Sequence, residues 1–229
     1  MLPQTFTPLR ENLGQQVYQH LRDRIFRMEI PPGARLGVSE IAEQMGVSRS
    51  PVRDALMMLV NEGVVEVNST GGYRVIQLTR SYIEDAFVVR RALELTAMRL
   101  CMAQLDRAQV QALHQKWQKL HAKGADDPTL LEDEIQSDQE LHKSIARMSK
   151  NALLMDALDR ITSITWLISR FTYASAQQRQ YGPLTIQEHL RILDAMQSGD
   201  TEAAVIALDE HLTRAFARSL ERLDSAQGK

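Results

Sequence analysis

Apolar residues in the first quarter of the chain recur at spacings of three and four, which is the period of a helix with one buried face. This pattern predicts a helix over residues 12–28, which Pro31-Pro32-Gly33 cannot continue. A shorter helix is expected over residues 39–45, with Ser39 as its N-cap. Gly46-Val47-Ser48 then forms a tight turn before the next helical pattern.

A third helix and a hairpin complete this segment. The helix is capped by Ser48 or Ser50 at its start, and Gly63 ends it. The period then changes, and residues 64–67 and 73–76 are rich in β-branched and aromatic residues. Glycines between these two runs permit the positive φ angles of a hairpin turn. Helix, helix, turn, helix and hairpin in this order predict a winged helix-turn-helix.

From Thr79 onward the helical period continues, and no strand pattern recurs. The predicted helices cover residues 82–104, 107–123, 129–149, 151–171, 185–198 and 201–223. Their apolar stripes and short connections favour an antiparallel bundle. We therefore expect a mostly α fold, with an N-terminal winged helix-turn-helix over residues 1–77 and an all-helical antiparallel bundle over residues 78–229.

Composition excludes several classes of protein. The 229 residues are 44% hydrophobic, but no run reaches the roughly 18 apolar residues that a transmembrane helix needs. The start of the chain lacks a basic segment followed by an apolar stretch, so we expect no secretory signal. Cys101 alone can form neither a disulfide framework nor a cysteine-ligated zinc finger, and it fits a reducing compartment. The expected location is the cytoplasm, without a membrane partner.

Charge is distributed unevenly along the chain. The net charge of −2 argues against a protein that coats nucleic acid non-specifically. All six lysines lie at Lys116 or later, whereas residues 1–75 carry eight arginines and eight acidic residues. Arginine forms planar, bidentate hydrogen bonds, and residues 44–53 contain no acid. Any surface that binds nucleic acid is therefore confined to a small part of the chain.

The start of the third predicted helix carries residues suited to DNA. In a helix-turn-helix, this helix enters the major groove by its N-terminal end, where free backbone N–H groups favour phosphate. Ser48 and Ser50 can donate hydroxyl hydrogen bonds to phosphate oxygens. Arg49 and Arg53 are four residues apart on one face, and either can pair with the O6 and N7 atoms of guanine. The alternative is a solvated helix cap, which the turn before it and the hairpin after it disfavour.

Three further positions in the first domain have both a structural and a DNA-binding interpretation. Arg35 is either a solvated side chain or a contact to a phosphate or a groove edge. Gly71 and Gly72 satisfy the hairpin, and a wing tip that lies along the minor groove also needs a backbone without side-chain bulk. For the glycines both interpretations can hold together.

The six histidines fall into two sets of three. One set flanks apolar stripes without an acid at metal-ligand spacing and is expected on the surface. These are His20, His114 and His121. The other set, with one aspartate, points from three predicted helices towards one interior. These residues are Asp138, His142, His189 and His211. Burying four such groups unpaired costs on the order of several kcal/mol, and a divalent cation satisfies all of them. The alternative is a hydrogen-bonded core cluster.

The run from Val47 to Leu56 is the most specific signal in the chain. It reads Val-Ser-Arg-Ser-Pro-Val-Arg-Asp-Ala-Leu and continues through Leu59 and Glu62-Gly63-Val64-Val65 to a Gly-Gly-Tyr wing. Over residues 14–77 the chain therefore resembles the GntR family of bacterial transcription regulators. The resemblance implies contacts of three arginines with DNA, and binding of a pseudo-palindrome as a homodimer. The arginines are Arg35, Arg49 and Arg53.

A series of motifs also runs through the helical domain. They are Arg90-Arg91-Ala92-Leu93-Glu94, Asp138-Gln139-Glu140-Leu141-His142, Glu188-His189 with the following Ile192-Leu193-Asp194-Ala195 and Gly199-Asp200, and His211-Leu212. The series resembles the FCD effector domain of the FadR-type branch of GntR regulators, although Leu141 replaces the usual aromatic residue. The resemblance implies a divalent metal on the four residues above and a small organic acid beside it. Arg90 is the family-matched partner for an effector carboxylate; alternatively it forms a salt bridge with Glu94.

Together these patterns predict a ligand-responsive transcription regulator, and specifically a repressor, that binds double-stranded operator DNA. The helical domain would provide effector binding and dimerisation. Three imidazoles and one carboxylate suit zinc or nickel, and manganese if water completes an octahedron. One alternative is a regulator for which the metal itself is the signal. Another is a metal-dependent enzyme, which lacks a His-Glu-x-x-His helix and a separate general base here. We therefore expect no enzymatic activity.

Overall fold

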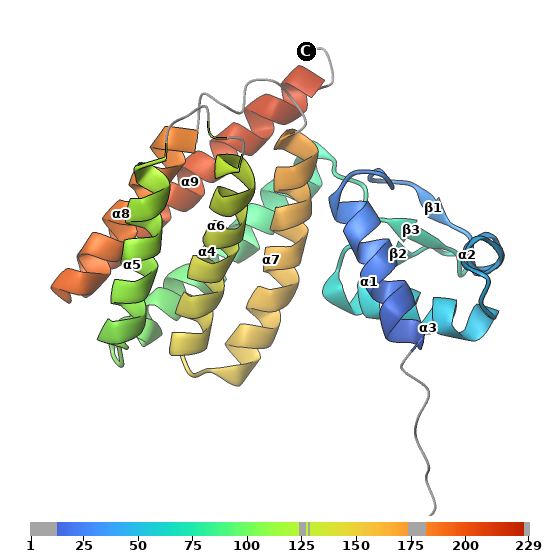
Figure 1. The fold of residues 1–229 in the computed structure, drawn as a ribbon, viewed down its shortest axis with the longest axis horizontal. Helices are drawn as coiled ribbons and strands as arrows, with labels where there is room; N and C mark the ends of the chain where they lie inside the picture. The colour runs from blue at the N-terminus through green and yellow to red at the C-terminus, as the bar shows by residue number, and fades with distance from the viewer. Residues whose placement is uncertain (1–12, 124–126, 128, 174–181, 227–229) are drawn as a thin grey trace, which may run out of the picture. The chain divides into compact units, whose positions relative to one another are not determined.

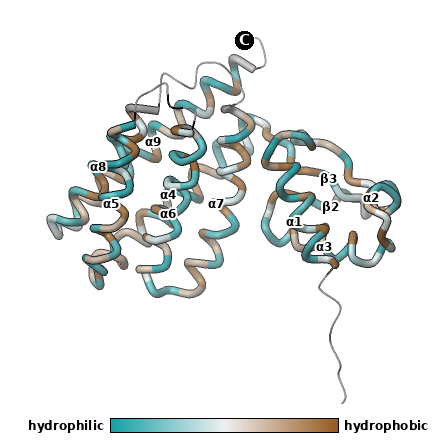
Figure 2. The backbone as a smooth tube through the Cα atoms, in the orientation of Figure 1, coloured by the Kyte–Doolittle hydropathy of each residue, from teal (hydrophilic) through white to brown (hydrophobic). Residues whose placement is uncertain are grey.

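The structure is a computed structural model that describes residues 13–123, 127, 129–173 and 182–226. The chain divides into two compact units, with the boundary in the sequence between Gln77 and Leu78 (Figure 1). Each unit buries apolar side chains of its own. Hydrophobic and hydrophilic residues alternate along the helices of both units (Figure 2), as expected for helices with one buried face.

The N-terminal unit combines three helices with a small antiparallel sheet. Its elements are α1 (Leu13–Phe26), β1 (Arg35–Leu36), α2 (Val38–Met45), α3 (Arg49–Glu62), β2 (Val65–Val67) and β3 (Tyr73–Val75). The strands follow the order β1-β3-β2. Helix α1 packs against α3, and both turn buried residues inward, among them Val17 and Leu21 on α1 and Leu56 and Leu59 on α3. The predicted winged helix-turn-helix is thereby confirmed.

Some predicted boundaries in this unit are wrong by a few residues. The predicted start of the first helix at residue 12 lies outside the described residues, and its end moves to Phe26 because Met28 takes a positive φ of 61°. Helix α2 begins one residue earlier than predicted, with Gly37 as its N-cap, so Ser39 lies within the helix. Ser48 is the N-cap of α3, but its side chain makes no capping hydrogen bond.

Strand β1 was not predicted. It pairs Arg35 with Arg74 and Leu36 with Tyr73 of β3. A strand of two residues is too short to show the alternation of apolar and polar residues by which a strand is recognised in a sequence. Strand β1 forms because it pairs with β3, which is distant in the sequence.

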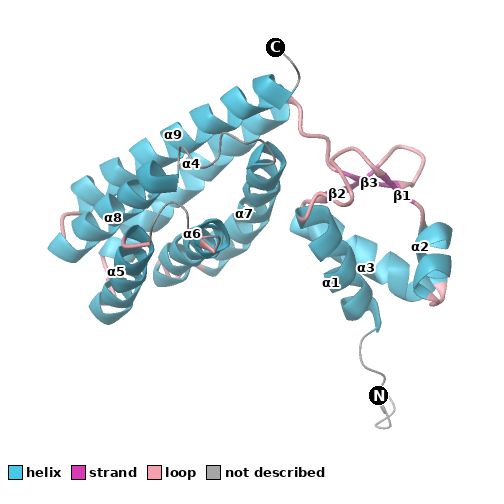
Figure 3. Ribbon diagram, turned by 45° about the horizontal axis from the view of Figure 1, so that its top comes forward, coloured by secondary structure: helices cyan, strands magenta, loops and turns pink. Residues whose placement is uncertain are grey.

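The described residues of the C-terminal unit form six helices in a bundle (Figure 3). They are α4 (Arg80–Met102), α5 (Arg107–His121), α6 (Leu130–Met148), α7 (Ala152–Tyr173), α8 (Gly182–Ser198) and α9 (Thr201–Ala226). Helix α4 packs against α6, α7 and α9, whereas α8 packs against α5 and α9. The predicted all-helical bundle is confirmed. None of the helices in the described part of the chain is long and apolar enough to cross a membrane.

Candidate metal centre and nucleic-acid interface

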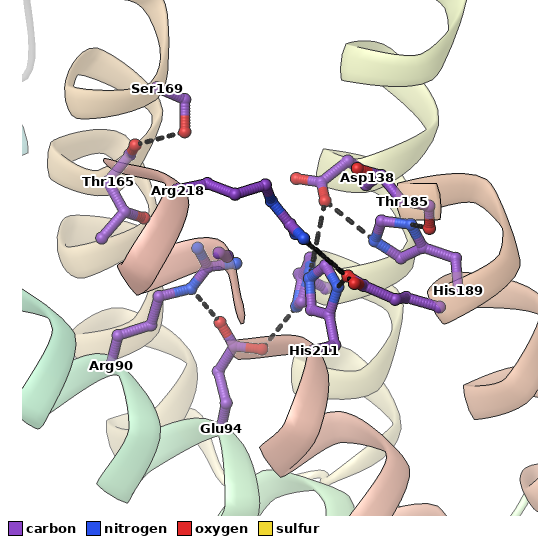
Figure 4. Close-up of polar contacts among 12 residues, drawn as sticks. Arg90, Glu94, Asp138, Thr165, Ser169, Thr185, His189, His211 and Arg218 are labelled. Carbon is purple, nitrogen blue, oxygen red and sulfur yellow. Dashed lines mark hydrogen bonds and ion pairs between the residues drawn. The ribbon is translucent and has the colours of Figure 1, made fainter. Parts of the chain in front are cut away.

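Three histidines and one aspartate converge in the interior of the helical unit (Figure 4). Asp138 and His142 lie one turn apart on α6, while His189 comes from α8 and His211 from α9. One donor atom of each residue lies within 4.8 Å of the donor atoms of the other three. The fold therefore brings together the four residues that the sequence placed on inward helix faces.

Asp138 is the common neighbour of the three imidazoles. Its Oδ1 atom lies 2.9 Å from Nε2 of His189, 3.5 Å from Nε2 of His142 and 4.0 Å from Nε2 of His211. The three histidines are buried, whereas the side chain of Asp138 is 34% exposed. All three Nε2 atoms therefore face one small volume beside the carboxylate.

The second nitrogen of each ring is held by an acceptor. Nδ1 of His189 donates to the backbone carbonyl of Thr185 over 2.8 Å, and Nδ1 of His142 donates to the carboxylate of Glu94. Trp117 stacks on the His189 ring, with centroids 4.0 Å apart, and restricts its rotation. A ring that carries its proton on Nδ1 presents the Nε2 lone pair to a ligand when the imidazole is neutral.

Glu188 orients the third histidine. It accepts a hydrogen bond from Nδ1 of His211 over 3.0 Å, and Arg218 donates to both of its carboxylate oxygens over 3.0 Å. Burial raises the pKa of Glu188, but His211 and Arg218 outweigh burial and lower this pKa to about 2. Glu188 is therefore ionised and can accept from both neighbours.

Two of the three rings are neutral and therefore suit metal ligation. Burial and the nearby His189 lower the pKa of His211 to about 3, and burial also lowers the pKa of His189, so both rings are neutral. Burial lowers the pKa of His142 as well, but Glu94 and Asp138 outweigh it and raise this pKa to about 9. His142 is thus the one ring of the cluster that is protonated on both nitrogens. A bound cation would replace the proton on its Nε2 atom.

Two atoms of the cluster show that the four residues fit a divalent cation. Nε2 of His142 and Nε2 of His189 are buried, and neither makes a well-formed hydrogen bond to a described residue, although Asp138 Oδ1 lies 3.5 Å from the first and 2.9 Å from the second. Leaving such an atom unsatisfied costs roughly 1–3 kcal/mol. A cation that accepts three imidazole nitrogens and a carboxylate oxygen satisfies both atoms, and this donor set is one that zinc and nickel prefer.

Arg90 forms a buried salt bridge with Glu94. Its Nε atom lies 2.5 Å from Glu94 Oε1, and both side chains are buried. Burial raises the pKa of Glu94, but Arg90 and His142 outweigh it and lower this pKa to about 2. The structure thus contains the salt bridge, which joins Arg90 to the histidine cluster through Glu94. The contact of Arg90 with an effector stays a prediction.

A cavity of about 50 Å³ lies next to the cluster, bordered by Asp138 and His211. This volume holds a few water molecules or a group of the size of a carboxylate. Its lining includes three arginines and several hydroxyl groups. These are Arg90, Arg218 and Arg222, with Thr162, Thr165, Ser169 and Ser219. Burial raises the pKa of Glu134, which also lines the cavity, to about 8. Because Glu134 is then protonated at neutral pH, the arginines give the cavity an anion-binding character.

Sequence reasoning did not identify three charged residues that line this cavity, namely Glu134, Arg218 and Arg222. Arg218 and Arg222 follow His211 by seven and eleven residues (218 − 211 and 222 − 211), so all three share one face of α9. Glu134 precedes Asp138 by four residues (138 − 134) and shares its face of α6. These spacings were a signal, but arginine and glutamate are so commonly exposed that spacing alone does not place them inside.

His114 also differs from its expected position. The sequence predicts a surface histidine, but its side chain is only 14% exposed, and its Nε2 lies 2.8 Å from Asp194 Oδ1 on α8. This contact holds α5 against α8, at a site separate from the histidine cluster.

In the N-terminal unit, the arginines predicted to contact DNA are exposed. Arg35, Arg49 and Arg53 form no ion pair with any described residue, whereas Arg22 and Arg74 in the same unit pair with glutamates. Ser48 and Ser50, which flank Arg49, are exposed as well. The start of α3 therefore presents unpaired cations, hydroxyl groups and free backbone N–H groups together.

The wing lies close to two of these arginines. Arg35, Arg53, Gly71 and Gly72 line one concave surface of about 530 Å³ in the N-terminal unit. Gly71 has a φ of 78°, and a Cβ atom on Gly72 would lie 2.9 Å from Nδ2 of Asn68. The positive φ favours glycine at position 71, whereas a side chain at position 72 would only displace the Asn68 amide. The contact of both glycines with DNA stays a prediction.

Comparisons with known proteins agree with this architecture. Residues 13–75 match the bacterial regulatory proteins of the gntR family, and residues 85–214 match the FCD domain. The chain is 29% identical over 211 residues to the probable D-xylose utilization operon transcriptional repressor of Paenarthrobacter nicotinovorans, covering 89% of this chain and 87% of that protein. It is 25% identical over 201 residues to the transcriptional repressor RspR of Escherichia coli K12, covering 87% of this chain and 86% of RspR.

A solved structure shows the same fold. Escherichia coli McbR matches this chain with a TM-score of 0.74 at 24% identity, covering 93% of this chain and 100% of McbR. A winged helix-turn-helix followed by such a helical domain defines a DNA-binding transcription regulator, not an enzyme. The chain belongs to the GntR family of bacterial transcription regulators, in the group that carries an FCD domain.

Proposed function

We propose that this regulator is a repressor that binds a pseudo-palindromic operator as a homodimer and senses a small carboxylate at a divalent metal. The observation that carries the proposal is the convergence of Asp138 and three histidine Nε2 atoms beside a cavity lined by arginines. Residues 1–77 would bind DNA, and residues 78–229 would bind the effector and dimerise.

In the DNA-binding unit, α3 enters the major groove by its N-terminal end. Arg49 and Arg53 read guanine or contact phosphate, while Ser48 and Ser50 hold phosphate oxygens. Arg35 binds the backbone near the wing, because it shares one concave surface with Arg53 and with Gly71 and Gly72 at the wing tip. The support is the exposure of these arginines without an acidic partner in the described chain.

In the helical unit, Asp138, His142, His189 and His211 hold the metal. Zinc and nickel suit this donor set, and manganese suits it if water completes an octahedron. When bound, the ion supplies a Lewis-acidic centre to which a carboxylate oxygen can bind. Glu94, Glu188 and the Thr185 carbonyl keep the three rings in the orientation that ligation requires.

The effector is a small anion that fits between the metal and the arginines of the cavity. Arg218 and Arg222 favour a carboxylate, and Arg90 contributes from α4. The hydroxyl groups of Thr165 and Ser169 favour an effector that carries hydroxyl groups besides its carboxylate. The small cavity requires an effector of few atoms or a movement of its walls.

Effector binding changes operator affinity only if the ligand prefers one arrangement of the dimer over the other. Two half-sites must be contacted together because one winged module reads too few base pairs for useful specificity. A shift of the helical unit that changes the spacing of the two α3 helices therefore alters affinity for the whole operator.

The proposal is tested with an operator fragment selected from random DNA. Small carboxylates are screened by thermal shift on metal-loaded and on chelator-treated protein, because a bound ligand raises apparent stability. We expect a carboxylate that stabilises only the metal-loaded protein and changes operator affinity by about fivefold or more. His189→Ala should abolish the response and keep operator binding.

One alternative has its own support. The chain alone supplies four ligands to a metal, and the cavity beside them is small. These two features suit a regulator that responds to the metal itself and needs no organic effector. Operator affinity that changes with metal and with no carboxylate would favour this alternative over the effector-sensing proposal.

A further inference from the structure

The exposed side of α3 continues past the two arginines at its start. Arg49, Arg53 and Met57 follow one another at intervals of four residues (53 − 49 and 57 − 53), and Asp54 precedes Met57 by three (57 − 54). Side chains at these spacings lie on one side of a helix. The opposite side of α3 is buried through Val52, Ala55, Leu56 and Leu59. Anything that approaches the exposed side therefore meets Asp54 and Met57 as well as the arginines.

Met57 is the apolar member of this exposed side. It is 45% exposed, and it is the one large apolar residue of the fully described helix α3 that is exposed to this degree. A single exposed methionine is common on protein surfaces, so its exposure alone identifies no ligand. Its place one turn after Arg53, on the helix that the proposed function puts in the major groove, restricts what it can meet. Its thioether chain has no hydrogen-bond donor and only a weak acceptor, so phosphate gives it no partner.

Asp54 is the acidic member of the same side. It is exposed, and it forms no ion pair with any residue that the structure describes, although Arg53 is its neighbour in the sequence. A carboxylate is repelled by the phosphate backbone, so an acid on the DNA-facing side of α3 is compatible with binding where bases lie opposite it. In the major groove, the N4 amino group of cytosine is the donor with which a carboxylate pairs.

We propose that Asp54 and Met57 read two neighbouring base pairs in the major groove, beyond the contacts of Arg49 and Arg53. Asp54 accepts a hydrogen bond from N4 of a cytosine, and Met57 packs on the 5-methyl group of a thymine. This inference rests on the entry of α3 into the major groove in the proposed function, and it adds two specificity-determining residues to that helix.

The spacing of the two residues suits neighbouring base pairs. A helix rises about 1.5 Å per residue, so Asp54 and Met57 are separated by about 4.5 Å along α3. Successive bases of one DNA strand are about 3.4 Å apart along the duplex axis. Two side chains at this separation therefore reach successive steps of the groove.

Thymine is the base that suits Met57. Its 5-methyl group is the apolar group that the base edges of the major groove present. Methionine is unbranched and adaptable, so it can follow the shape of this edge. Contact between the side chain and the methyl group removes apolar surface of both from water, which is favourable.

Uracil scanning of the selected operator tests the methionine contact. Each thymine of one half-site is replaced in turn by uracil, which keeps the base pair and removes only the methyl group. For the full-length wild type, fluorescence anisotropy should show one position at which uracil weakens binding about fourfold, as expected for one methyl group. Met57→Ala should bind thymine and uracil operators equally. Leu13→Ala is the matched control, because Leu13 is 42% exposed on α1, and it should keep the uracil effect.

A change of base preference tests the aspartate contact. Asparagine pairs with N6 and N7 of adenine, so Asp54→Asn should select adenine where the wild type selects cytosine, and tenfold or more of the discrimination for cytosine should be lost. The selection from random DNA is repeated with the variant to measure this. Glu43→Gln removes an equally exposed acid from α2 and should leave the selected sequence unchanged. Circular dichroism establishes that each variant is folded.

Two results would overturn the inference. One is a wild type that no uracil substitution weakens, or a Met57→Ala variant that uracil weakens as much as the wild type. The other is an Asp54→Asn variant that selects the wild-type sequence. If Arg49→Ala and Arg53→Ala still weaken binding, such results reject only the roles of Asp54 and Met57. If the arginine variants also bind the operator like the wild type, the entry of α3 into the major groove is rejected too.

Discussion

Single atoms decide what the histidine cluster can bind. Glu94, Glu188 and the Thr185 carbonyl each accept a hydrogen bond from Nδ1 of one imidazole, which leaves three Nε2 atoms facing Asp138. These partners come from α4 and α8, and His142 sits on a third helix, α6. A change in any of them rotates a ring or alters its basicity, so they are positioning residues for the metal.

Removal of one ligand should lower metal content without unfolding the DNA-binding unit. We expect wild-type protein to hold about one divalent ion per chain and His189→Ala to hold much less, because three ligands bind a cation more weakly than four. Elemental analysis after refilling with zinc, nickel or manganese measures this. His114→Ala is the control, since that imidazole contacts Asp194 away from the cluster. A wild type without bound metal would make the four residues a hydrogen-bonded core cluster.

Glu134 should make the metal-free protein less stable as pH rises. Its pKa is about 8 in the folded protein, against an ordinary value of 4.5, chiefly because of burial. Between these two values the folded state holds a proton that the unfolded chain has released, so stability falls as pH increases. Glu134→Gln cannot ionise and should escape this loss.

The measurement for Glu134 is thermal unfolding at pH 6 and pH 8.5 after chelator treatment. The melting temperature of Glu134→Gln relative to wild type should be higher at pH 8.5 than at pH 6. Glu140→Gln, an exposed glutamate of the same helix, should show no such trend. An equal difference at both pH values would contradict a buried, protonated carboxyl.

At the scale of secondary-structure elements, α3 and the β2–β3 hairpin determine how the N-terminal unit meets DNA. Helix α3 begins at Arg49 and ends at Glu62, and the C-cap Gly63 takes a positive φ of 87° that lets the chain turn into β2. Strand β1 then adds Arg35 to the edge beside β3. A helix start and a wing thus lie in one unit that can span adjacent grooves.

Arg49→Ala and Arg53→Ala should each weaken operator binding and leave metal uptake unchanged. An arginine that reads guanine contributes about 1–3 kcal/mol, and its loss relaxes specificity at one base pair. An arginine that contacts phosphate instead lowers affinity on all sequences and reduces the salt slope by about 1. Fluorescence anisotropy at several salt concentrations separates the two roles. Arg27→Ala, an exposed arginine just after α1, serves as the control.

At the scale of the whole molecule, the division between Gln77 and Leu78 separates two cores. The candidate metal centre lies entirely within one of them. Any influence of the metal or an effector on DNA must therefore pass through the relation between the two units or between two copies of the chain.

Metal should stabilise one unit only. Binding at a concentration of 100 times its dissociation constant stabilises the helical unit by about 2.7 kcal/mol, which corresponds to about 5 °C or more for a domain of this size. Scanning calorimetry should resolve two transitions, because two-domain proteins depart from a single cooperative step. Chelator should lower the transition of the helical unit and leave the other in place. A shift of both transitions would indicate that the units unfold together.

Local patterns in the sequence determined most of the elements. Apolar spacing located the helices of both units, because each must turn one face inward whatever its neighbours are. Glycine and proline marked the turns for steric reasons that act within a few residues. The same periodicity placed Asp138, His142, His189 and His211 on inward faces, since helical spacing alone tells which side of a helix a residue occupies.

The tertiary structure decided what depends on partners distant in the chain. Strand β1 exists only because β3 supplies its hydrogen bonds. Glu188 becomes a positioning residue only where His211 and Arg218 meet it from another helix, and Arg90 is buried with Glu94 instead of exposed. Sequence spacing places a residue on a face of its own helix, but burial, pKa and hydrogen-bond partners are set by the side chains that other helices bring to that face.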